Sequence, residues 1–307
     1  MTSVITSAYD KSSTLTVDQM MSDPTFIPQR IVDGLNGAFV EDLFFRPEGS
    51  NAGVVAFREA AATVMADEAE DVAEFGEIPV SDPRLGDLKS AYAIKTALAA
   101  RFSYEQRTEN RVDSVNQEIT ALQKSVVLAG YKASSAALKA AGVPELVIDT
   151  PWSAGGDVAT NLFDAIEMVQ GANDGHGGQY DYAPNTILLH PRALTAAVRN
   201  EKMNKFYVGN AALENPVFKG LKDIVLAGEL RVATSRLIPV GEAYVFEQGA
   251  PGFLSNTIPL QATPLYCEGG ESPLGGPTMS WRTDVVRKRA IGVDNPKAVV
   301  KLTGVIA

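Results

Sequence analysis

The residues that could carry acid-base or metal chemistry are few in this sequence. The chain has two histidines, and one of them, His176, stands in the glycine-rich stretch 171–182 together with Asp174 and Asp181. An imidazole and two carboxylates are side chains that bind metal ions. A further ligand at a defined spacing is missing, and a surface loop explains the glycines without a metal. We therefore expect no metal at this stretch.

The other reactive side chains favour structural roles. His190 separates an apolar run from Pro191, a position more typical of a structural histidine than of a general base. Cys267 is the single cysteine, so the chain has no internal disulfide. A lone cysteine fits a reducing compartment and a small, buried or half-buried apolar residue.

Motifs of common enzymes are absent from the sequence. It contains no GxxxxGK[ST] phosphate loop, no GxSxG nucleophile elbow and no HExxH zinc helix. We therefore expect a protein that is not an enzyme and has no catalytic residue, cofactor or metal. An α/β enzyme with an unrecognised site is the weaker alternative.

Composition indicates a folded protein that does not bind nucleic acid tightly. The chain has 307 residues, of which 45% are hydrophobic and 21% are charged, which is ordinary globular usage. Its 27 basic and 37 acidic residues give a net charge of -10, so any contact with DNA should be loose and non-specific. No apolar run approaches the ~20 residues that span a bilayer. We expect synthesis in the cytosol and no membrane partner.

The N-terminal part of the sequence has no clear period. Residues 1–23 are rich in serine and threonine, which predicts an extended arm. Residues 28–46 are apolar but are interrupted by Gly34 and Gly37, so a short helix and an extended clamp are equally compatible. The aromatic residues of this segment, which need a surface to cover, are Phe39, Phe44 and Phe45.

The segment 74–106 reads as two extended limbs without an evident core of their own. Residues 81–87, SDPRLGD, predict the turn between them. Pro79 and Pro83 lack the donor that a central strand needs, so they favour an edge or a tip. Between residues 92 and 104, apolar and charged residues alternate, which favours a strand over a helix.

The strongest periodic signal predicts a helix over residues 110–141. Its apolar residues recur at spacings of three and four. They are Val112, Val115, Ile119, Leu122, Val126, Ala129 and Ala133. Thr108 or Asn110 is expected to cap this helix, and Gly130 to bend or end it. Because the stripe is narrow and lacks a Leu/Ile seam, we favour a helix that lies along a sheet over a coiled coil.

The C-terminal half reads as a mixed α/β domain followed by extended limbs. We expect helices at 157–170 and from Pro191 onward, and short strands at 186–189, 223–227, 231–239 and 242–249. Residues 281–307 form two extended limbs around a turn at 294–296. The last limb, from residue 298 to 300, is expected to join the sheet under the long helix, which makes the α/β domain an insertion.

Two stretches of like charge stand out. The basic residues are Arg282, Arg287, Lys288 and Arg289, and the acidic stretch is DEAEDVAE at 67–74. The basic residues form either a solvated strand face or a contact with a phosphate or an acidic neighbouring subunit. The acidic stretch is a plausible partner for them on another copy of the chain.

Five segments together resemble the major capsid proteins of tailed bacteriophages of the Hong Kong 97 type. They are FREA at 57–60, VAEFGEIPV at 72–80, FSYEQ at 102–106, NRVDSVNQEI at 110–119 and NPKAVVKL at 295–302. The succession of these unlike segments carries the resemblance, which covers most of the chain in the order of the family.

The resemblance implies an α+β fold, the Hong Kong 97-like capsid fold. It implies an N-terminal arm at 1–52 and an extended hairpin loop at 53–103. The spine helix and the first part of the peripheral domain follow at 104–149. An inserted axial domain is implied at 150–252, and the closing strands of the peripheral domain at 253–307.

The same resemblance implies self-assembly into the icosahedral head shell, the capsid of the virion, around a double-stranded DNA genome. The implied partners are other copies in hexamers and pentamers, a portal, loosely held DNA and, because the chain opens almost directly into its arm, a separate scaffolding protein. Whether a decoration protein binds is left open. The alternative in the same fold is an encapsulin-like nanocompartment shell, which encloses enzymes.

In such a shell the loop would lie over an adjacent subunit and residues 1–46 would reach under another. The residues expected at these contacts are Phe39, Phe44, Phe45, Glu77, Pro79, Asp82, Pro83, Arg84, Leu85, Arg287, Lys288 and Arg289. Some relatives form a lysine–asparagine crosslink between subunits. Lys89 or Lys95 with Asn295 are conceivable members of one, although they match no motif of the family.

Overall fold

The computed structural model describes residues 15–62, 64–174, 178–205, 225–226, 230–270 and 278–306. The helices are α1 Val17–Ser22, α2 Phe26–Leu35, α3 Glu41–Phe44, α4 Tyr104–Thr108, α5 Val112–Ala140, α6 Val158–Gln170, α7 Pro191–Arg199 and α8 Glu201–Lys205, with 3-10 turns at Trp152–Ala154 and Pro296–Ala298. The strands are β1 Phe45–Ser50, β2 Val54–Arg58, β3 Leu88–Tyr92, β4 Ile94–Ser103, β5 Glu145–Val147, β6 Thr186–Leu189, β7 Val225–Leu226, β8 Leu230–Thr234, β9 Glu242–Phe246, β10 Gly252–Ala262, β11 Tyr266–Cys267, β12 Ser280–Gly292 and β13 Val299–Thr303.

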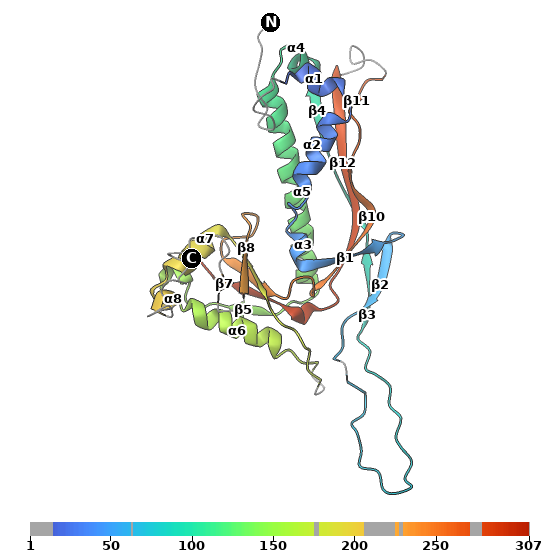
Figure 1. Cartoon of the computed structure of the whole chain (residues 1–307), viewed down its shortest axis with the longest axis vertical. Coiled ribbons are helices and arrows are strands. Elements are labelled where there is room, and N and C mark those ends of the chain that lie inside the picture. Colours follow the sequence, from blue (N-terminus) through green and yellow to red (C-terminus); the bar gives the residue numbers. More distant parts are fainter. Residues whose placement is uncertain are drawn as a thin grey trace.

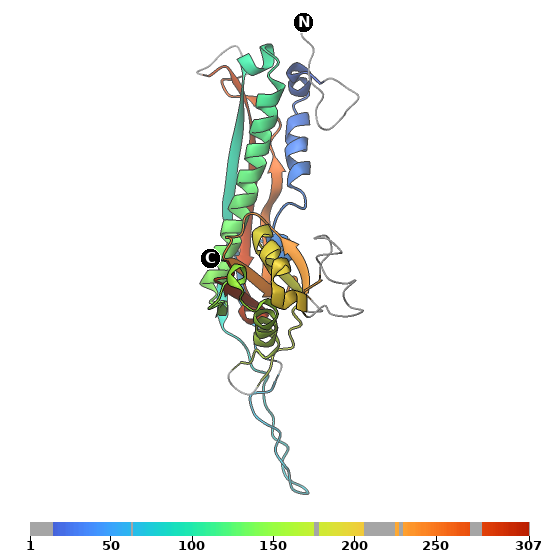
Figure 2. The same ribbon diagram turned by 90° about the vertical axis from the view of Figure 1, so that its left-hand side faces the viewer.

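These elements form two units and a projecting loop. The elongated unit consists of α1, α2 and α5 along the sheet that contains β4, β10 and β12 (Figure 1). The compact unit contains α6, α7 and α8 on a second sheet. The loop between β2 and β3 extends far from both units, and the view turned by 90° shows that it is thin in both directions (Figure 2).

The long helix α5 lies along the sheet, as the narrow stripe predicts. Its stripe residues are buried at Val112, Val115, Ile119, Leu122 and Val126. They pack on Phe102 of β4 and on Trp281 and Val285 of β12. Burial of each large apolar side chain stabilises the fold by about 1.5–3 kcal/mol, so one helix face accounts for much of this core.

The start of α5 differs from the prediction. The helix begins after Arg111, and neither Thr108 nor Asn110 caps it with its side chain. Asn110 has a left-handed backbone with φ of 52°, and its Oδ1 accepts a hydrogen bond from the Val17 amide at 2.7 Å. Asn110 therefore anchors α1, which the helix pattern alone does not reveal. The helix also continues through Gly130 to Ala140.

The expectation of an extended arm up to residue 23 is wrong for the part that the structure describes. Thr16 and Gln19 form a reciprocal capping box at the start of α1. Apolar side chains of α1 and α2 are buried against α5, at Val17, Met20, Met21, Ile27, Ile31 and Leu35. Residues 17–35 therefore pack on their own subunit. Residues 1–14 lie outside the described part of the chain.

The sheet of the elongated unit is mixed. Strand β10 pairs with β1 in parallel and with β12 antiparallel, and β12 also pairs antiparallel with β11 and β4. Helices α1, α2 and α5 cover one face. On the other face, the β2–β3 hairpin packs Phe57 edge-on to Phe253 with ring centroids 5.2 Å apart. Among the described helices none packs beyond this hairpin, so we call this surface the open sheet face.

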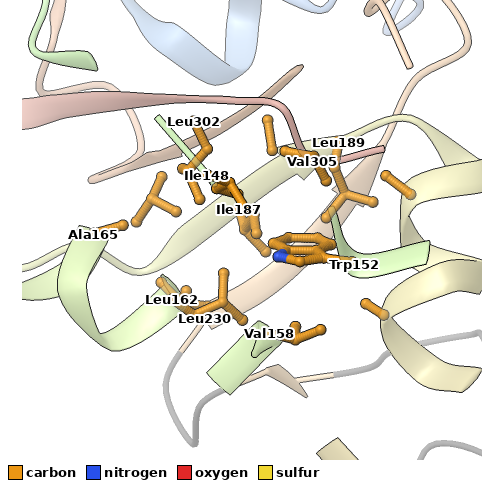
Figure 3. Packing of buried hydrophobic residues seen from close by; sticks show 14 of the residues in the cluster. Ile148, Trp152, Val158, Leu162, Ala165, Ile187, Leu189, Leu230, Leu302 and Val305 are labelled. Atoms are coloured by element: carbon orange, nitrogen blue, oxygen red, sulfur yellow. The ribbon is translucent and has the colours of Figure 1, made fainter. Parts of the chain in front are cut away.

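The compact unit confirms most of the predicted elements. Asp157 caps α6, β6 covers 186–189, and α7 begins at Pro191. Nδ1 of His190 accepts a hydrogen bond from the Arg192 amide at 3.0 Å, so this histidine caps a helix. Figure 3 shows apolar side chains gathered around Trp152 in the core between the helices and the sheet.

The placement of the last limb was predicted wrongly. Strand β13 lies in the sheet of the compact unit, between β5 and β9, and not in the sheet under α5. Val300 and Leu302 point into the core of this unit, where they are fully buried. The limb joins this sheet because its two apolar side chains are buried there. After β12 the chain therefore leaves the elongated unit and enters the compact unit.

The extended loop turns at a different place from the predicted one. Strands β2 and β3 pair antiparallel, and Met65 and Pro83 form an isolated bridge farther out. The chain reverses at Glu74 and Phe75, where Phe75 has a positive φ of 66°. Residues 81–87 lie along the returning limb. Because Met65 pairs with Pro83, the turn lies midway between them in the sequence. Pro83 and Gly86 therefore lie on the returning limb and not at the tip of the loop.

Candidate subunit-contact surfaces

The extended loop 59–87 exposes large apolar side chains that the subunit itself does not cover. Phe75 is 99% exposed, Val80 94%, Ile78 77% and Leu85 68%. Large apolar side chains left exposed on one segment are typical of a surface that binds another protein. Of these, Leu85 was among the predicted contact residues, whereas Phe75, Ile78 and Val80 were missed individually by sequence reasoning. One signal for them was available: apolar residues that follow neither a helix nor a strand period, in or next to an acidic stretch, have no core of their own subunit to pack in.

The root of the loop is held against the compact unit. The Ala60 amide donates to the Asp294 carbonyl at 2.8 Å, and the Tyr180 hydroxyl donates to the Ala60 carbonyl at 3.0 Å. On the returning limb, Arg84 pairs with Asp174 at 3.5 Å. These contacts fix the direction in which the loop leaves the subunit.

The predicted contact residues of the loop have two kinds of surroundings. Glu77, Pro79, Asp82, Pro83 and Leu85 are exposed. Arg84, in contrast, is half-buried and faces Asp174 of its own subunit. The exposed residues are accessible to a neighbouring subunit, and their contact with one stays a prediction.

The predicted contact role of Phe39, Phe44 and Phe45 is corrected by their burial. All three are less than 10% exposed within the single chain. The ring of Phe44 lies 4.6 Å from that of Phe246 and 5.4 Å from that of Tyr244. Phe44 and Phe45 therefore cover the joint between the two units of their own subunit, and Phe39 packs in the core under α5.

The predicted contact role of Arg287 and Arg289 is wrong for the same reason. Both guanidinium groups lie under α5 and pair with Glu41, which is fully buried; the Arg289–Glu41 distance is 2.9 Å. Burial lowers the pKa of Arg289 from its ordinary value, and the Glu41 carboxylate counteracts this shift. Lys288 lies between them on β12 and points to the open sheet face.

A second charge cluster lies on the open sheet face. Arg101 and Arg282 are directly opposite each other on β4 and β12. Glu268 binds Arg101 at 2.6 Å and also lies 3.5 Å from Arg282, and Asp284 binds Arg282 at 2.6 Å. Hydrogen bonding to Arg101, with help from Ser280, lowers the pKa of Glu268 to about 2. The two like charges are thus neutralised within the subunit.

This cluster predicts a pH dependence. A carboxylate whose pKa is lower in the folded chain stabilises it above its ordinary pKa, and this contribution is lost as the pH falls through the folded pKa. For Glu268 the loss falls between pH 4.5 and about 2. Glu268→Gln should lower the urea midpoint at pH 6 but much less at pH 2.5. Equal differences from the wild type at both pH values would contradict the prediction.

The remaining candidate chemistry has no support in the described residues. No group of three His, Cys, Asp or Glu residues there is arranged to hold a metal ion. Asp174 pairs with Arg84, and His176 falls outside the described residues. Cys267 is half-buried. The Asn295 side chain accepts from Tyr182 and donates to the Ala250 carbonyl, so it is held inside the subunit.

Membrane insertion likewise has no support in the helices. Among the helices that the structure describes, none combines the length and the apolar character that crossing a bilayer requires.

The long helix on its sheet, the compact α/β unit and the unsupported loop define a class of protein, the subunit of a Hong Kong 97-like phage capsid. The chain belongs to the phage capsid protein family, whose sequence model matches residues 87–302. It is a capsid shell protein, and the family and fold are those of a structural protein. Membership of this family implies that the protein is located in the virion.

Solved structures with this fold are distant in sequence. The structure from Mycobacterium phage Bobi has a TM-score of 0.57 at 14% identity, with 98% of this chain and 95% of that chain covered. The capsid of cyanophage P-SCSP1u has a TM-score of 0.55 at 15% identity, covering 86% of each chain. A virus-like particle from Pyrococcus furiosus has a TM-score of 0.54 at 12% identity, covering 90% of this chain and 97% of that one. No curated protein matches the sequence significantly.

Proposed function

We propose that copies of this chain assemble as hexamers and pentamers into a closed icosahedral head shell around double-stranded DNA. In this proposal the extended loop 59–87 of each subunit lies across its neighbour. The observation that carries it is the nearly complete exposure of Phe75, Ile78 and Val80 on a loop without a core. A stable contact buries about 1,200–2,000 Å² in total, and a long thin loop supplies such area without a larger subunit.

The charge of the chain supports the proposed contents of the shell. A net charge of -10 disfavours tight binding of phosphates, so packaged DNA stays loosely held. The buried Arg287 and Arg289 contribute no free cationic surface. A shell that has to be filled with DNA benefits from an inner surface that does not retain it.

The proposal also includes partners that assist assembly. We expect a separate scaffolding protein and a portal, and synthesis in the cytoplasm of the host before the subunits enter the virion. Expression of the chain alone tests the scaffold. Homogeneous closed shells formed without any other phage protein would contradict the need for one.

Electron microscopy of the protein from its native source, paired with nuclease protection, tests the function. Closed icosahedral shells with protected DNA are the expected result. Shells that enclose protein would indicate a nanocompartment instead. Full-length protein that forms only small particles would overturn both.

A further inference from the structure

Two lysines form an unusual pair on the open sheet face. Lys95 of β4 and Lys288 of β12 are direct partners in the antiparallel register. They therefore project on the same face, away from the buried Arg287 and Arg289. Directly opposite like charges destabilise a sheet unless a counter-charge lies nearby. We call Lys95 and Lys288 the lysine pair.

The same two strands contain a matched pair with a different environment. Arg101 and Arg282 are also directly opposite each other, and Glu268 and Asp284 neutralise them within the subunit. For the lysine pair, no carboxylate of the described residues forms an ion pair with either ammonium group. Lys95 is exposed and Lys288 is half-buried, so the pair is accessible. Within the described part of the chain, one of these two like-charge pairs thus has no counter-charge.

The extended loop carries the complementary charge. Its acidic segment, residues 67–74, contains five carboxylates, at Asp67, Glu68, Glu70, Asp71 and Glu74. All five side chains are exposed, and the sequence has no lysine or arginine between Arg58 and Arg84. The acidic segment therefore has no basic residue of the loop itself to pair with before the returning limb reaches Arg84.

The acidic segment does not reach the lysine pair of its own subunit. It begins nine residues beyond Arg58, and an extended chain advances ~3.3 Å per residue, so it lies on the order of 30–50 Å from the end of β2. Figure 1 shows that the loop runs away from the sheet that contains β4 and β12. Only the acidic segment of a second copy can therefore approach the pair.

We infer that the lysine pair Lys95/Lys288 receives the acidic segment 67–74 of a second copy of this chain. The inference rests on the proposed function, in which the loop lies across a neighbour, and it names the receiving residues. Charge attraction fixes the register of the loop on the sheet, while the apolar residues near the tip supply most of the affinity. Because the pair is accessible to solvent, the contact should weaken as salt is raised.

Charge exchange between the two surfaces tests this inference. Lys95→Glu with Lys288→Glu reverses the lysine pair, and Asp67→Lys with Glu68→Lys reverses part of the acidic segment. Each double variant should raise the subunit concentration needed for assembly about tenfold, because a modest change repeats at every contact in the shell. The variant that combines all four changes should recover most of this loss. Sedimentation velocity at low and high salt measures the assembled fraction.

Matched controls keep the test decisive. Lys124→Glu with Lys132→Glu makes the same charge change on exposed positions of α5 and should leave assembly near the wild-type level. Lys95→Gln with Lys288→Gln provides a milder variant, and circular dichroism verifies that each chain is folded. Two outcomes would overturn the inference while wild-type shells still form. In the first, the fourfold variant assembles no better than the worse of the two double variants. In the second, a charge reversal changes only the retention of DNA. All variants are assembled with the scaffolding protein present, because the proposed function includes one. If the wild type forms no shells even under these conditions, the proposed function fails and this inference with it.

Discussion

Replacement of Glu41 by glutamine is expected to lower the free energy of unfolding by about 3–5 kcal/mol. The Glu41 carboxylate is fully buried and accepts hydrogen bonds from Arg287 and Arg289. The cluster of one carboxylate and two guanidinium groups has a net charge of +1, and glutamine raises it to +2 in the same buried site. Buried charge without a partner carries the full cost of lost hydration.

The geometry around Glu41 leaves little room for compensation. Arg287 already stacks over the Phe39 ring at 5.0 Å, and Nε of Arg289 has no hydrogen-bond partner. On the helix side, a Cβ at Gly130 would lie 3.2 Å from both Glu41 Oε2 and the Phe39 ring. A glycine inside a helix costs about 1 kcal/mol, and here it allows α5 to approach the carboxylate closely.

Unfolding of the full-length, unassembled chain in guanidinium chloride measures the change in the free energy of unfolding caused by Glu41→Gln. Glu109→Gln is the matched control, because Glu109 also pairs with an arginine but is half exposed, and it should change stability by less than about 1 kcal/mol. Combining Glu41→Gln with Arg287→Met and Arg289→Met should recover part of the loss, since the unpaired charges are removed. A Glu41→Gln chain as stable as the Glu109→Gln control would show that the buried cluster does not stabilise the subunit.

The long helix and the elements of the compact unit were predictable because their signals are local. Seven apolar residues at helical spacing define α5, and Pro191 after a buried strand marks α7. Helix α1 has only six residues, too few to establish a period, and it depends on the hydrogen bond from Val17 to Asn110. The Thr16–Gln19 capping box is a local signal for its start, but the burial of Val17 and Met20 and the contact with Asn110 are tertiary and are not contained in the local sequence.

The contact surfaces were predictable only in part. The loop was predicted from its length, its prolines and its lack of a core, and its tip was not, because the bridge between Met65 and Pro83 sets the turn. The pairing of Glu41 with Arg287 joins residues 246 positions apart, and no sequence pattern connects them. One signal was available. Residues 287 and 289 share a strand face that Lys288 does not, so the basic run could not act as a single surface.

Replacement of the loop residues Phe75, Ile78 and Val80 by serine is expected to abolish assembly while the subunit remains folded. Burial of each side chain by a neighbour contributes about 1.5–3 kcal/mol, so the triple variant loses most of the apolar contribution of the loop at every contact. All three are more than three-quarters exposed in the single chain, so their loss removes little from its own core. Assembly and subunit stability are thereby separated in one variant.

Sedimentation velocity and electron microscopy of the triple variant measure assembly, and guanidinium unfolding of the same sample measures subunit stability. Val147→Ser with Met168→Ser removes exposed apolar side chains of the compact unit and serves as the control that should still assemble. If the triple variant formed shells at the wild-type concentration, the loop would not be the principal contact. If it unfolded as readily as Glu41→Gln, the loop would belong to the core of its own subunit. Assembly and subunit stability are expected to respond differently because the apolar side chains of the loop are buried only where another copy covers them.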